Sequence, residues 1–253
     1  MESLVPQSSR QNGSPRESAG KECRILACSP RAGGNCDAAA KLFDEAYGGR
    51  HDGESEKASV SFLRGHAVEP CIACNACGRM AGRLARRGTP LTLASLAHGP
   101  EDGAGRFPPF GCPLTARDDS AALLHALATA PSLCLVAPVY FYHLPARLKA
   151  LVDRTQSFWS LRLAELDVFA GQDARICHVI LIGARPRGEQ LFTGSLLTLK
   201  YALGGLNIRL AEPLLLHGLD EPGELAADQE MARRVRAYAE KAAHRREARQ
   251  EHA

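Results

Sequence analysis

Three cysteines follow one another at intervals of three residues, in the pattern Cys71-Ile-Ala-Cys74-Asn-Ala-Cys77. This spacing can bring three thiolates to one centre, as a cubane iron–sulfur cluster requires, with each thiolate bound to one iron. Such a cluster needs a fourth ligand, and the candidate is Cys112, which is followed by Pro113, a recurring neighbour of cluster cysteines. The pattern therefore predicts a [4Fe–4S] cluster held by Cys71, Cys74, Cys77 and Cys112.

Other uses of these cysteines stay open. A structural zinc site could take the same four thiolates, although zinc sites favour paired C-x2-C knuckles over three cysteines in seven residues. A redox thiol pair would need a cysteine of low pKa at a helix start, for which Pro70 before Cys71 gives slight support. The cysteines could also bind no metal. Because 34 residues separate Cys77 from Cys112, we expect residues 80–110 to form an irregular insertion that loops out between the third and fourth ligands.

A second stretch suited to chemistry is the turn Ser29-Pro-Arg-Ala-Gly-Gly-Asn-Cys36, which joins an apolar run to a helical pattern. Its two glycines let the backbone approach a ligand closely, and the amide hydrogens at a helix start suit an anion. Ser29 and Asn35 add side-chain donors, and Arg31 adds a positive charge. The turn lacks the Lys-Ser/Thr ending of a triphosphate-binding loop and is not G-x-G-x-x-G. It predicts a phosphate monoester site, with a simple turn as the alternative.

Expected strands and helices alternate along the chain and position the cysteine motif and the glycine-containing turn. Five short apolar runs alternate with amphipathic segments, and the runs cover residues 23–28, 60–63, 133–137, 176–182 and 208–216. The alternation predicts an α/β fold with a doubly wound, five-stranded parallel sheet and an irregular cysteine-containing insertion after the second strand. Ligands bind such sheets beyond the carboxyl ends of the strands, at the switch point in strand order. We therefore expect the functional residues just after each strand.

Two charged pairs are expected to serve helices rather than chemistry. Asp118 and Asp119 can cap a helix with Leu123, Leu124 and Leu127 on its inner face. Asp153 and Arg154 are expected to form an ion pair that fixes a helix running from residue 145 to about residue 158.

Three stretches together resemble the NADPH-dependent FMN reductase group of flavodoxin-like proteins. They are the first strand with its Ser-Pro-Arg-Ala-Gly-Gly-Asn turn, Ala137-Pro-Val-Tyr-Phe-Tyr142, and Pro145-Ala-Arg-Leu-Lys-Ala-Leu-Val-Asp-Arg154. Their order and approximate spacing also match, over residues 23–219. The resemblance implies a flavodoxin-like fold, FMN as cofactor, NAD(P)H as a possible substrate, and a homodimer or homotetramer.

The same resemblance implies which residues contact FMN. The first loop wraps the phosphate, the second packs against the isoalloxazine ring and ribityl chain, and the third flanks the ring. Most members have Ser or Thr at the position of Cys36, so here the backbone amide is the remaining contact at that position. The implied contacts are Ser29, Arg31, Gly34, Asn35 and Cys36 in the first loop, Pro138, Val139, Tyr140 and Phe141 in the second, and Gly183 and Arg185 in the third.

The cysteine run resembles the iron–sulfur flavoproteins, a branch of the same group whose compact cysteine motif lies after the second strand. In that branch Asp-Asp follows the fourth cysteine by a few residues, and here Asp118-Asp119 follow Cys112. The sequence departs from the branch in one respect, because the branch places its fourth cysteine only a few residues after the third.

The composition limits the classes of protein to which the chain can belong. Hydrophobic residues at 45% and charged residues at 23% are ordinary globular values and exclude wholesale disorder. The longest apolar stretch, residues 133–144, contains Pro138 and His143 and is shorter than the roughly 20 residues that span a bilayer. The N-terminus lacks the apolar region of a secretory signal. We therefore expect a cytoplasmic protein without a membrane partner.

Charge is concentrated at the C-terminus, where residues 231–253 contain six Arg, one Lys and three Glu. A basic tail could contact nucleic acid, but no nucleic-acid-binding motif accompanies it, and the pattern favours a terminal helix with a solvated basic surface. We expect three parts: a disordered leader (1–21), a flavodoxin-like FMN-binding domain (22–220) that contains the cluster-binding segment (70–113), and a basic C-terminal helix (221–253).

Taken together, these observations predict a redox protein in which FMN exchanges electrons with a [4Fe–4S] cluster. Its partner would be a redox protein or a small-molecule electron acceptor. Two alternatives remain: a cluster-free NAD(P)H-dependent FMN or quinone reductase, and a non-enzymatic flavodoxin-like carrier with structural zinc.

Overall fold

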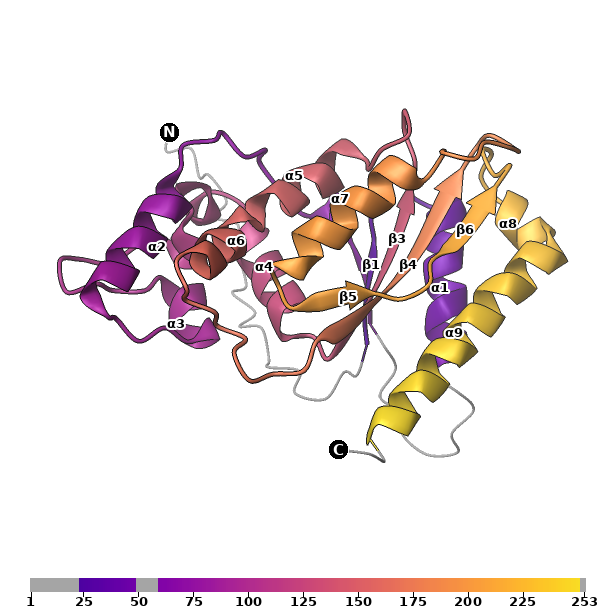
Figure 1. The fold of residues 1–253 in the computed structure, drawn as a ribbon. Helices are drawn as coiled ribbons and strands as arrows, with labels where there is room; N and C mark the ends of the chain where they lie inside the picture. Colours follow the sequence, from indigo (N-terminus) through magenta and orange to yellow (C-terminus); the bar gives the residue numbers. More distant parts are fainter. Residues whose placement is uncertain (1–22, 49–58, 251–253) are drawn as a thin grey trace, which may run out of the picture.

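A computed structural model describes residues 23–48 and 59–250, so the predicted leader lies outside the described residues. One parallel sheet forms the centre of the molecule (Figure 1). Its strands follow the order β2-β1-β3-β4-β5, and β6 also pairs with β4. The order confirms the predicted doubly wound sheet. The strands are β1 (Arg24–Ala27), β2 (Ser59–Phe62), β3 (Ser132–Pro138), β4 (Arg175–Gly183), β5 (Ile208–Leu210) and β6 (Leu214–His217).

The predicted fifth strand is two short strands along one edge of β4. β5 pairs with the start of β4, and β6 pairs with its end. Between them lies Pro213, which has no amide hydrogen to give to the ladder. The register shifts by one residue from β5 to β6, as in a bulge.

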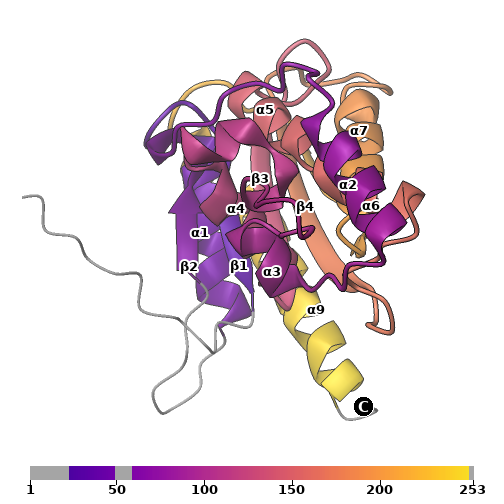
Figure 2. The ribbon, with the colours of Figure 1, turned by 90° about the vertical axis from the view of Figure 1, so that its left-hand side faces the viewer.

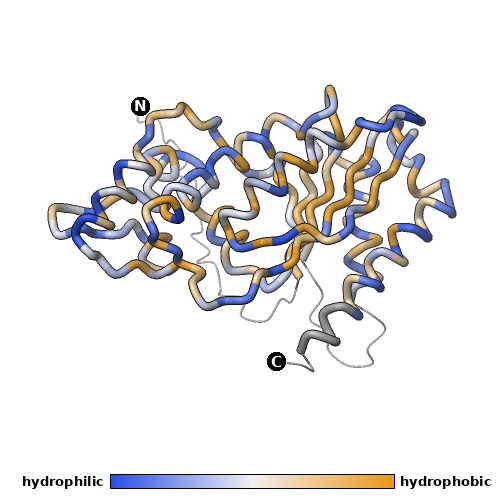
Figure 3. Tube along the Cα trace, viewed as in Figure 1, coloured by the Kyte–Doolittle hydropathy of each residue, from blue (hydrophilic) through white to orange (hydrophobic). Residues whose placement is uncertain are grey.

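Helices cover both faces of the sheet. On β3, Cys134 and Val136 pack with α1 (Asn35–Tyr47) and α9 (Gln229–Gln250), whereas Leu133 and Leu135 belong to the core of the opposite face. Because both faces are covered, β3 and the second half of β4 are continuously apolar, as Figure 3 shows for the centre of the molecule. The opposite face is covered by α4 (Ser120–Thr129), α5 (Ala146–Arg154), α6 (Gln156–Leu163) and α7 (Thr193–Gly204).

The helix expected from residue 145 to about residue 158 is two helices, α5 and α6. The break lies at Thr155, whose hydroxyl donates to the carbonyl of Val152 at 2.8 Å. A side chain that binds its own backbone in this way competes with helical hydrogen bonds. No helix in the described parts of the chain is long and apolar enough to span a bilayer.

The insertion after β2 packs into the core, so the expectation that it loops out is wrong, and about half of residues 80–110 are helical rather than irregular. Met80 and Leu84 on α2, Leu96 on α3 and Phe110 are all fully buried in the same core as the inner face of α4. Figure 2 shows α2 beside α6. The insertion consists of α2 (Ala76–Arg87), α3 (Leu93–His98) and the short 3-10 helices η2 (Pro109–Gly111) and η3 (Pro113–Ala116).

Candidate functional site

Three loops meet at the carboxyl edge of the sheet, after β1, β3 and β4. The amide of Val139 donates to the carbonyl of Ile182 at 2.8 Å, which joins the second loop to the end of β4. Arg185 in the third loop donates to the Tyr142 hydroxyl at 2.7 Å, and its guanidinium lies 5.5 Å from the centre of that ring. The structure therefore brings the predicted loop residues to one edge.

The first and second loops leave the sheet side by side, because they follow β1 and β3, which pair in parallel. Burial is the main cause that raises the pKa of Tyr140 in the second loop.

The first loop has free amide groups where α1 begins. Gly33 has a φ of 68°, a left-handed conformation that favours glycine, and no atom lies within 4 Å of the position of a Cβ there. Its amide donates to Asp37 Oδ2 at 2.8 Å. The described residues offer no acceptor to the amides of Asn35 and Cys36, the first two residues of the helix. This is the arrangement that binds anions at helix N-termini.

The polar side chains of this loop bind the protein itself. Arg31 donates to the carbonyl of Asp220 at 2.9 Å. The Asn35 side chain donates to the carbonyl of Glu221 at 3.0 Å and accepts from the amide of Leu225 at 3.1 Å. The Ser29 hydroxyl accepts from the amide of Arg31 at 3.1 Å. In this conformation Asn35 thus holds the loop after β6.

Sequence reasoning missed that loop after β6. It leads to α8 (Glu224–Ala227), and the Glu224 carboxylate accepts from the amides of Asp220 and Glu221. The position of this loop directly after the last strand is the sequence signal that indicates it, since residues after each strand lie at the carboxyl edge of the sheet. Sequence reasoning also missed that Arg64 pairs with Asp37 at 2.8 Å, because the partners are far apart in the chain.

Cys36 turns its thiol into the core. The residue is 3% exposed, and burial, followed by the nearby Asp37, raises the pKa of the thiol to about 12. A thiol in this position contributes no charge, so only the Cys36 amide is available to a ligand.

The second loop carries an exposed and strained aromatic turn. Tyr140 and His143 exchange backbone hydrogen bonds of 3.0 Å, and the two residues between them, Phe141 and Tyr142, have φ angles of 50° and 65°. Asn-Gly suits such a turn, and a bulky residue there costs about 1–2 kcal/mol. Phe141 is fully exposed, so core packing does not explain it. Strain of this kind is concentrated at ligand sites.

The four cysteines of the predicted cluster lie in and around the insertion: Cys71 and Cys74 precede α2, Cys77 lies in its first turn, and Cys112 lies between η2 and η3. Cys71 and Cys74 are exposed, and Cys77 and Cys112 are partly exposed. In the described residues, no three His, Cys, Asp or Glu side chains converge as a metal site requires. The thiols have the chemistry of cluster ligands, but this conformation does not gather them.

The backbone nevertheless brings the third and fourth cysteines close together. A Cβ on Gly111 would lie 3.5 Å from the Cα of Cys77, which is ordinary van der Waals contact, and Gly111 has a φ of 67°, which favours glycine. Cys112 is the next residue. The insertion therefore returns the chain to the first turn of α2, next to Cys77.

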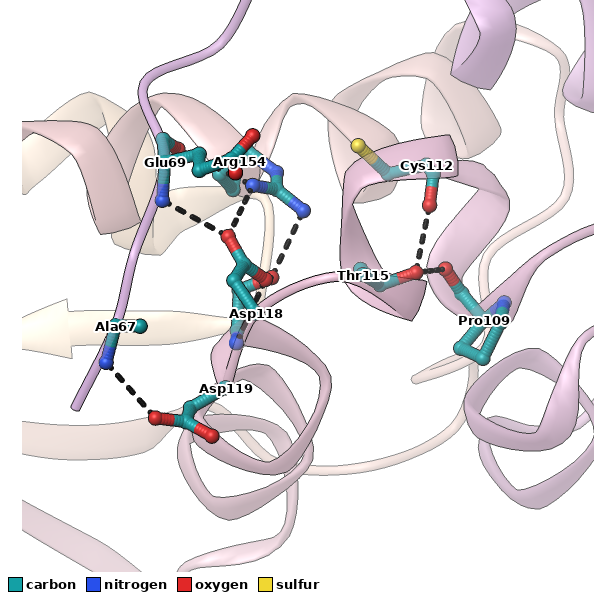
Figure 4. Close-up of polar contacts among 9 residues, drawn as sticks. Ala67, Glu69, Pro109, Cys112, Thr115, Asp118, Asp119 and Arg154 are labelled. Atoms are coloured by element: carbon teal, nitrogen blue, oxygen red, sulfur yellow. Dashed lines mark hydrogen bonds and ion pairs between the residues drawn. The ribbon is translucent and has the colours of Figure 1, made fainter.

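The predicted ion pair between Asp153 and Arg154 is wrong, because adjacent residues on a helix point in different directions. Asp153 pairs with Lys149 at 2.6 Å, one helical turn away. Arg154 instead pairs with Asp118 at 2.9 Å, and both side chains are almost completely buried (Figure 4).

Comparison with known proteins identifies the fold. No family model and no curated protein matches the chain. Among solved structures it is similar to an FMN-dependent NADH-azoreductase from Bacillus anthracis, described in complex with FMN, with a TM-score of 0.51, 17% identity, and coverage of 87% of this chain and 98% of that one. It is also similar to an NAD(P)H:quinone oxidoreductase from Methanothermobacter marburgensis, with a TM-score of 0.52, 14% identity, and coverage of 86% and 94%. Both similarities extend over nearly the whole of the other protein. The strand order of this chain, β2-β1-β3-β4-β5, is the order of flavodoxin-like sheets.

The chain has a flavodoxin-like fold. In this fold the strand order reverses between β1 and β3, and ligands bind in the crevice at that point. The loops that carry Arg31 and Tyr140 leave the sheet from these two strands. The fold therefore places the predicted phosphate loop and the aromatic turn on the two sides of its usual ligand crevice.

Proposed function

We propose that the protein is an FMN-dependent oxidoreductase that takes electrons from NAD(P)H. The observation that carries the proposal is the convergence of three loops at the switch point, with free helix-start amides in the first of them. The amides of Asn35 and Cys36 would hold the phosphate, and Arg31 would add its charge. Ser29 and Asn35 would act chiefly by fixing the loop, since their side chains bind neighbouring backbone.

The flavin ring would lie against the second and third loops. Pro138, Val139, Tyr140 and Phe141 line one side, and Gly183 and Arg185 lie on the other. The Arg185–Tyr142 hydrogen bond fixes the exposed turn beside the ring site. FMN, when bound, supplies the electron-transfer chemistry, while the protein supplies position and electrostatics.

We further propose that Cys71, Cys74, Cys77 and Cys112 hold a [4Fe–4S] cluster that exchanges electrons with FMN. One feature of the motif supports it beyond its spacing. Ala73 and Asn75 have φ angles of 52° and 56°, and left-handed residues in a loop turn backbone amides inward, as around many iron–sulfur sites. Metal binding is coupled to folding, so the cluster itself would draw the exposed thiols together.

A cluster-free NAD(P)H-dependent FMN or quinone reductase is the second candidate. It is favoured by one observation, the separation of the thiols in the described structure. In either case the electron acceptor would be a small molecule or a redox protein, and the chain would work as a homodimer or homotetramer.

The flavin proposal is tested by titrating the metal-free protein with FMN and following flavin fluorescence. The variant Arg31→Ala should bind FMN about 10- to 100-fold more weakly, because a hydrogen bond to a charged group contributes about 1.5–3 kcal/mol. The control Arg236→Ala removes the same charge from an exposed position on α9 and should bind like the wild type. Equal affinity of all three proteins would contradict the phosphate loop.

A further inference from the structure

The chain that leads into the cysteine motif is held by two carboxylates from a distant part of the sequence. Residues 67–75 form neither helix nor strand. The amide of Ala67 donates to Asp119 Oδ2 at 2.8 Å, and the amide of Glu69 donates to Asp118 Oδ2 at 2.9 Å (Figure 4). The amide of Asp119 in turn donates to the carbonyl of Ala67 at 2.9 Å. Residues just before Cys71 therefore lie against residues just after Cys112.

Arg154 ties both segments to α5. Its guanidinium donates to Asp118 Oδ2 at 2.9 Å, to the carbonyl of Glu69 at 3.1 Å and to the Ser120 hydroxyl at 2.8 Å. The other oxygen of Asp118 accepts from the amide and the hydroxyl of Ser120. Both oxygens of Asp118 are thus satisfied by donors from three parts of the chain. We call Asp118, Asp119 and Arg154 the acidic clamp.

The segment that carries Cys112 is fixed on its other side. The Thr115 hydroxyl lies 2.6 Å from the carbonyl of Cys112 and 2.8 Å from that of Pro109, which closes a tight turn around the cysteine (Figure 4). The preceding Gly111 rests on the first turn of α2 at Cys77. Cys112 therefore lies beside the first turn of α2, and Asp118 follows it six positions further along the chain.

The ion pair between Asp118 and Arg154 is buried, and its carboxylate stays charged. The Asp118 and Arg154 side chains are 1% and 0% exposed, and burying an ion pair gives little net stability. Burial would raise the pKa of Asp118, but hydrogen bonds from Ser120, Glu69 and Arg154 outweigh burial and lower it. The carboxylate is therefore charged at neutral pH and keeps all its donors in place.

We propose that Asp118, together with Asp119 and Arg154, is a positioning residue that aligns the Cys71-bearing segment with the Cys112-bearing segment for a shared metal. The proposal rests on the four-cysteine site proposed above. It explains why an insertion of 34 residues between the third and fourth cysteines is compatible with one site, because the clamp fixes both ends of the motif independently of the insertion.

The test measures Co²⁺ binding to the reduced, metal-free protein, since the visible absorption of Co²⁺ reports tetrahedral thiolate ligation. Asp118→Asn keeps the shape but turns one acceptor into a donor, which faces either the donors of Glu69 and Arg154 or those of Ser120. We expect Co²⁺ to bind at least about 10-fold more weakly, as outer-shell substitutions do at metal sites, with FMN affinity unchanged. The control is Asp153→Asn, which removes a carboxylate next to Arg154 but outside the clamp and should bind Co²⁺ like the wild type.

A second variant keeps the test decisive if Asp118→Asn does not fold. Asp119 is half-exposed, so Asp119→Ala strands no buried charge and removes the side-chain contact with Ala67. It should weaken Co²⁺ binding by about 2- to 10-fold, the effect of one hydrogen bond. Co²⁺ affinity that is unchanged in the folded variants, or that falls only in parallel with FMN affinity, would overturn the clamp.

The outcomes also separate the clamp from the proposed function. A wild-type protein that binds Co²⁺ through four thiolates but is isolated without iron would contradict the proposed [4Fe–4S] cluster. It would leave the proposed role of the acidic clamp intact. A wild-type protein that binds FMN but does not ligate Co²⁺ through four thiolates would overturn the clamp and leave the flavin site.

Discussion

The carboxyl edge of the sheet and the cysteine segment are built in opposite ways. At the sheet edge the side chains of the loops bind other parts of the protein: Asn35 and Arg31 hold the loop after β6, and Arg185 holds Tyr142. In the cysteine segment, backbone contacts fix the ends of the motif, but Cys71 and Cys74 remain exposed and separate. The loops of the proposed flavin site are thus held in place by the fold, whereas the proposed metal site would be completed by its metal.

The nine cysteines also fall into two groups, one buried and one at least partly exposed. Five are buried in the core. Burial is the main cause that raises the pKa of each of these five thiols, to about 12 for Cys23 and Cys36. The other four, Cys71, Cys74, Cys77 and Cys112, are exposed or partly exposed. Buried cysteines of the first kind pack as small hydrophobic residues, and only the second kind can act as ligands.

The largest expected effect is loss of the cluster when one of the exposed thiols is removed. Cys74→Ser should eliminate iron and acid-labile sulfide from protein purified without oxygen, because a cubane needs four ligands. Cys134→Ser, in the core of β3, should retain both. Iron content would be measured together with FMN content, and equal iron in the two variants would remove the distinction between the two groups of cysteines.

The next largest effect is expected in the rates at which exposed and buried thiols react. At pH 8, a thiol with a pKa near 12 has roughly 1,000-fold less thiolate than one of ordinary pKa. In the reduced, metal-free protein, a maleimide should therefore modify four cysteines quickly and all nine only after denaturation. Mass spectrometry counts the adducts. Rapid modification of Cys36 or Cys23 in the folded protein would contradict their burial.

The smallest expected effect concerns the aromatic turn. Phe141→Asn should raise the melting temperature by about 2–4 °C, because Asn tolerates the left-handed conformation and Phe141 buries nothing. The matched control is Phe110→Asn, which has a φ of 53° but is fully buried, and it should instead lower stability by about 3–5 kcal/mol. Calorimetry compares the two. A Phe141→Asn protein that melts lower than the wild type would show that the exposed ring makes a stabilising contact.

Much of the sheet could be predicted from the sequence because its strands are apolar on both faces. The ranges expected for the first four strands agree with β1 to β4 to within one or two residues at each end. The loops of the proposed flavin site could be located for the same reason, since they follow these strands. The break in the last strand was signalled only by Pro213.

The insertion and the acidic clamp could not be predicted in the same way. On α2, only Met80, Ala81 and Leu84 are buried, and four arginines occupy the outer side, so the apolar pattern is short. The partner of Arg154 lies 36 residues away, and the choice of Asp118 over the adjacent Asp153 depends on tertiary packing. Buried polar contacts between distant segments leave no periodic signal in a sequence.

The most direct test of the account is the visible spectrum of protein purified without oxygen, with iron and acid-labile sulfide assayed in the same sample. We expect flavin bands on a broad iron–sulfur absorption, with about four iron atoms per chain. Flavin bands without iron would contradict the metal site and leave an FMN reductase with exposed cysteines. Absence of flavin even after addition of FMN would contradict the central claim, that the loops at the switch point form an FMN site.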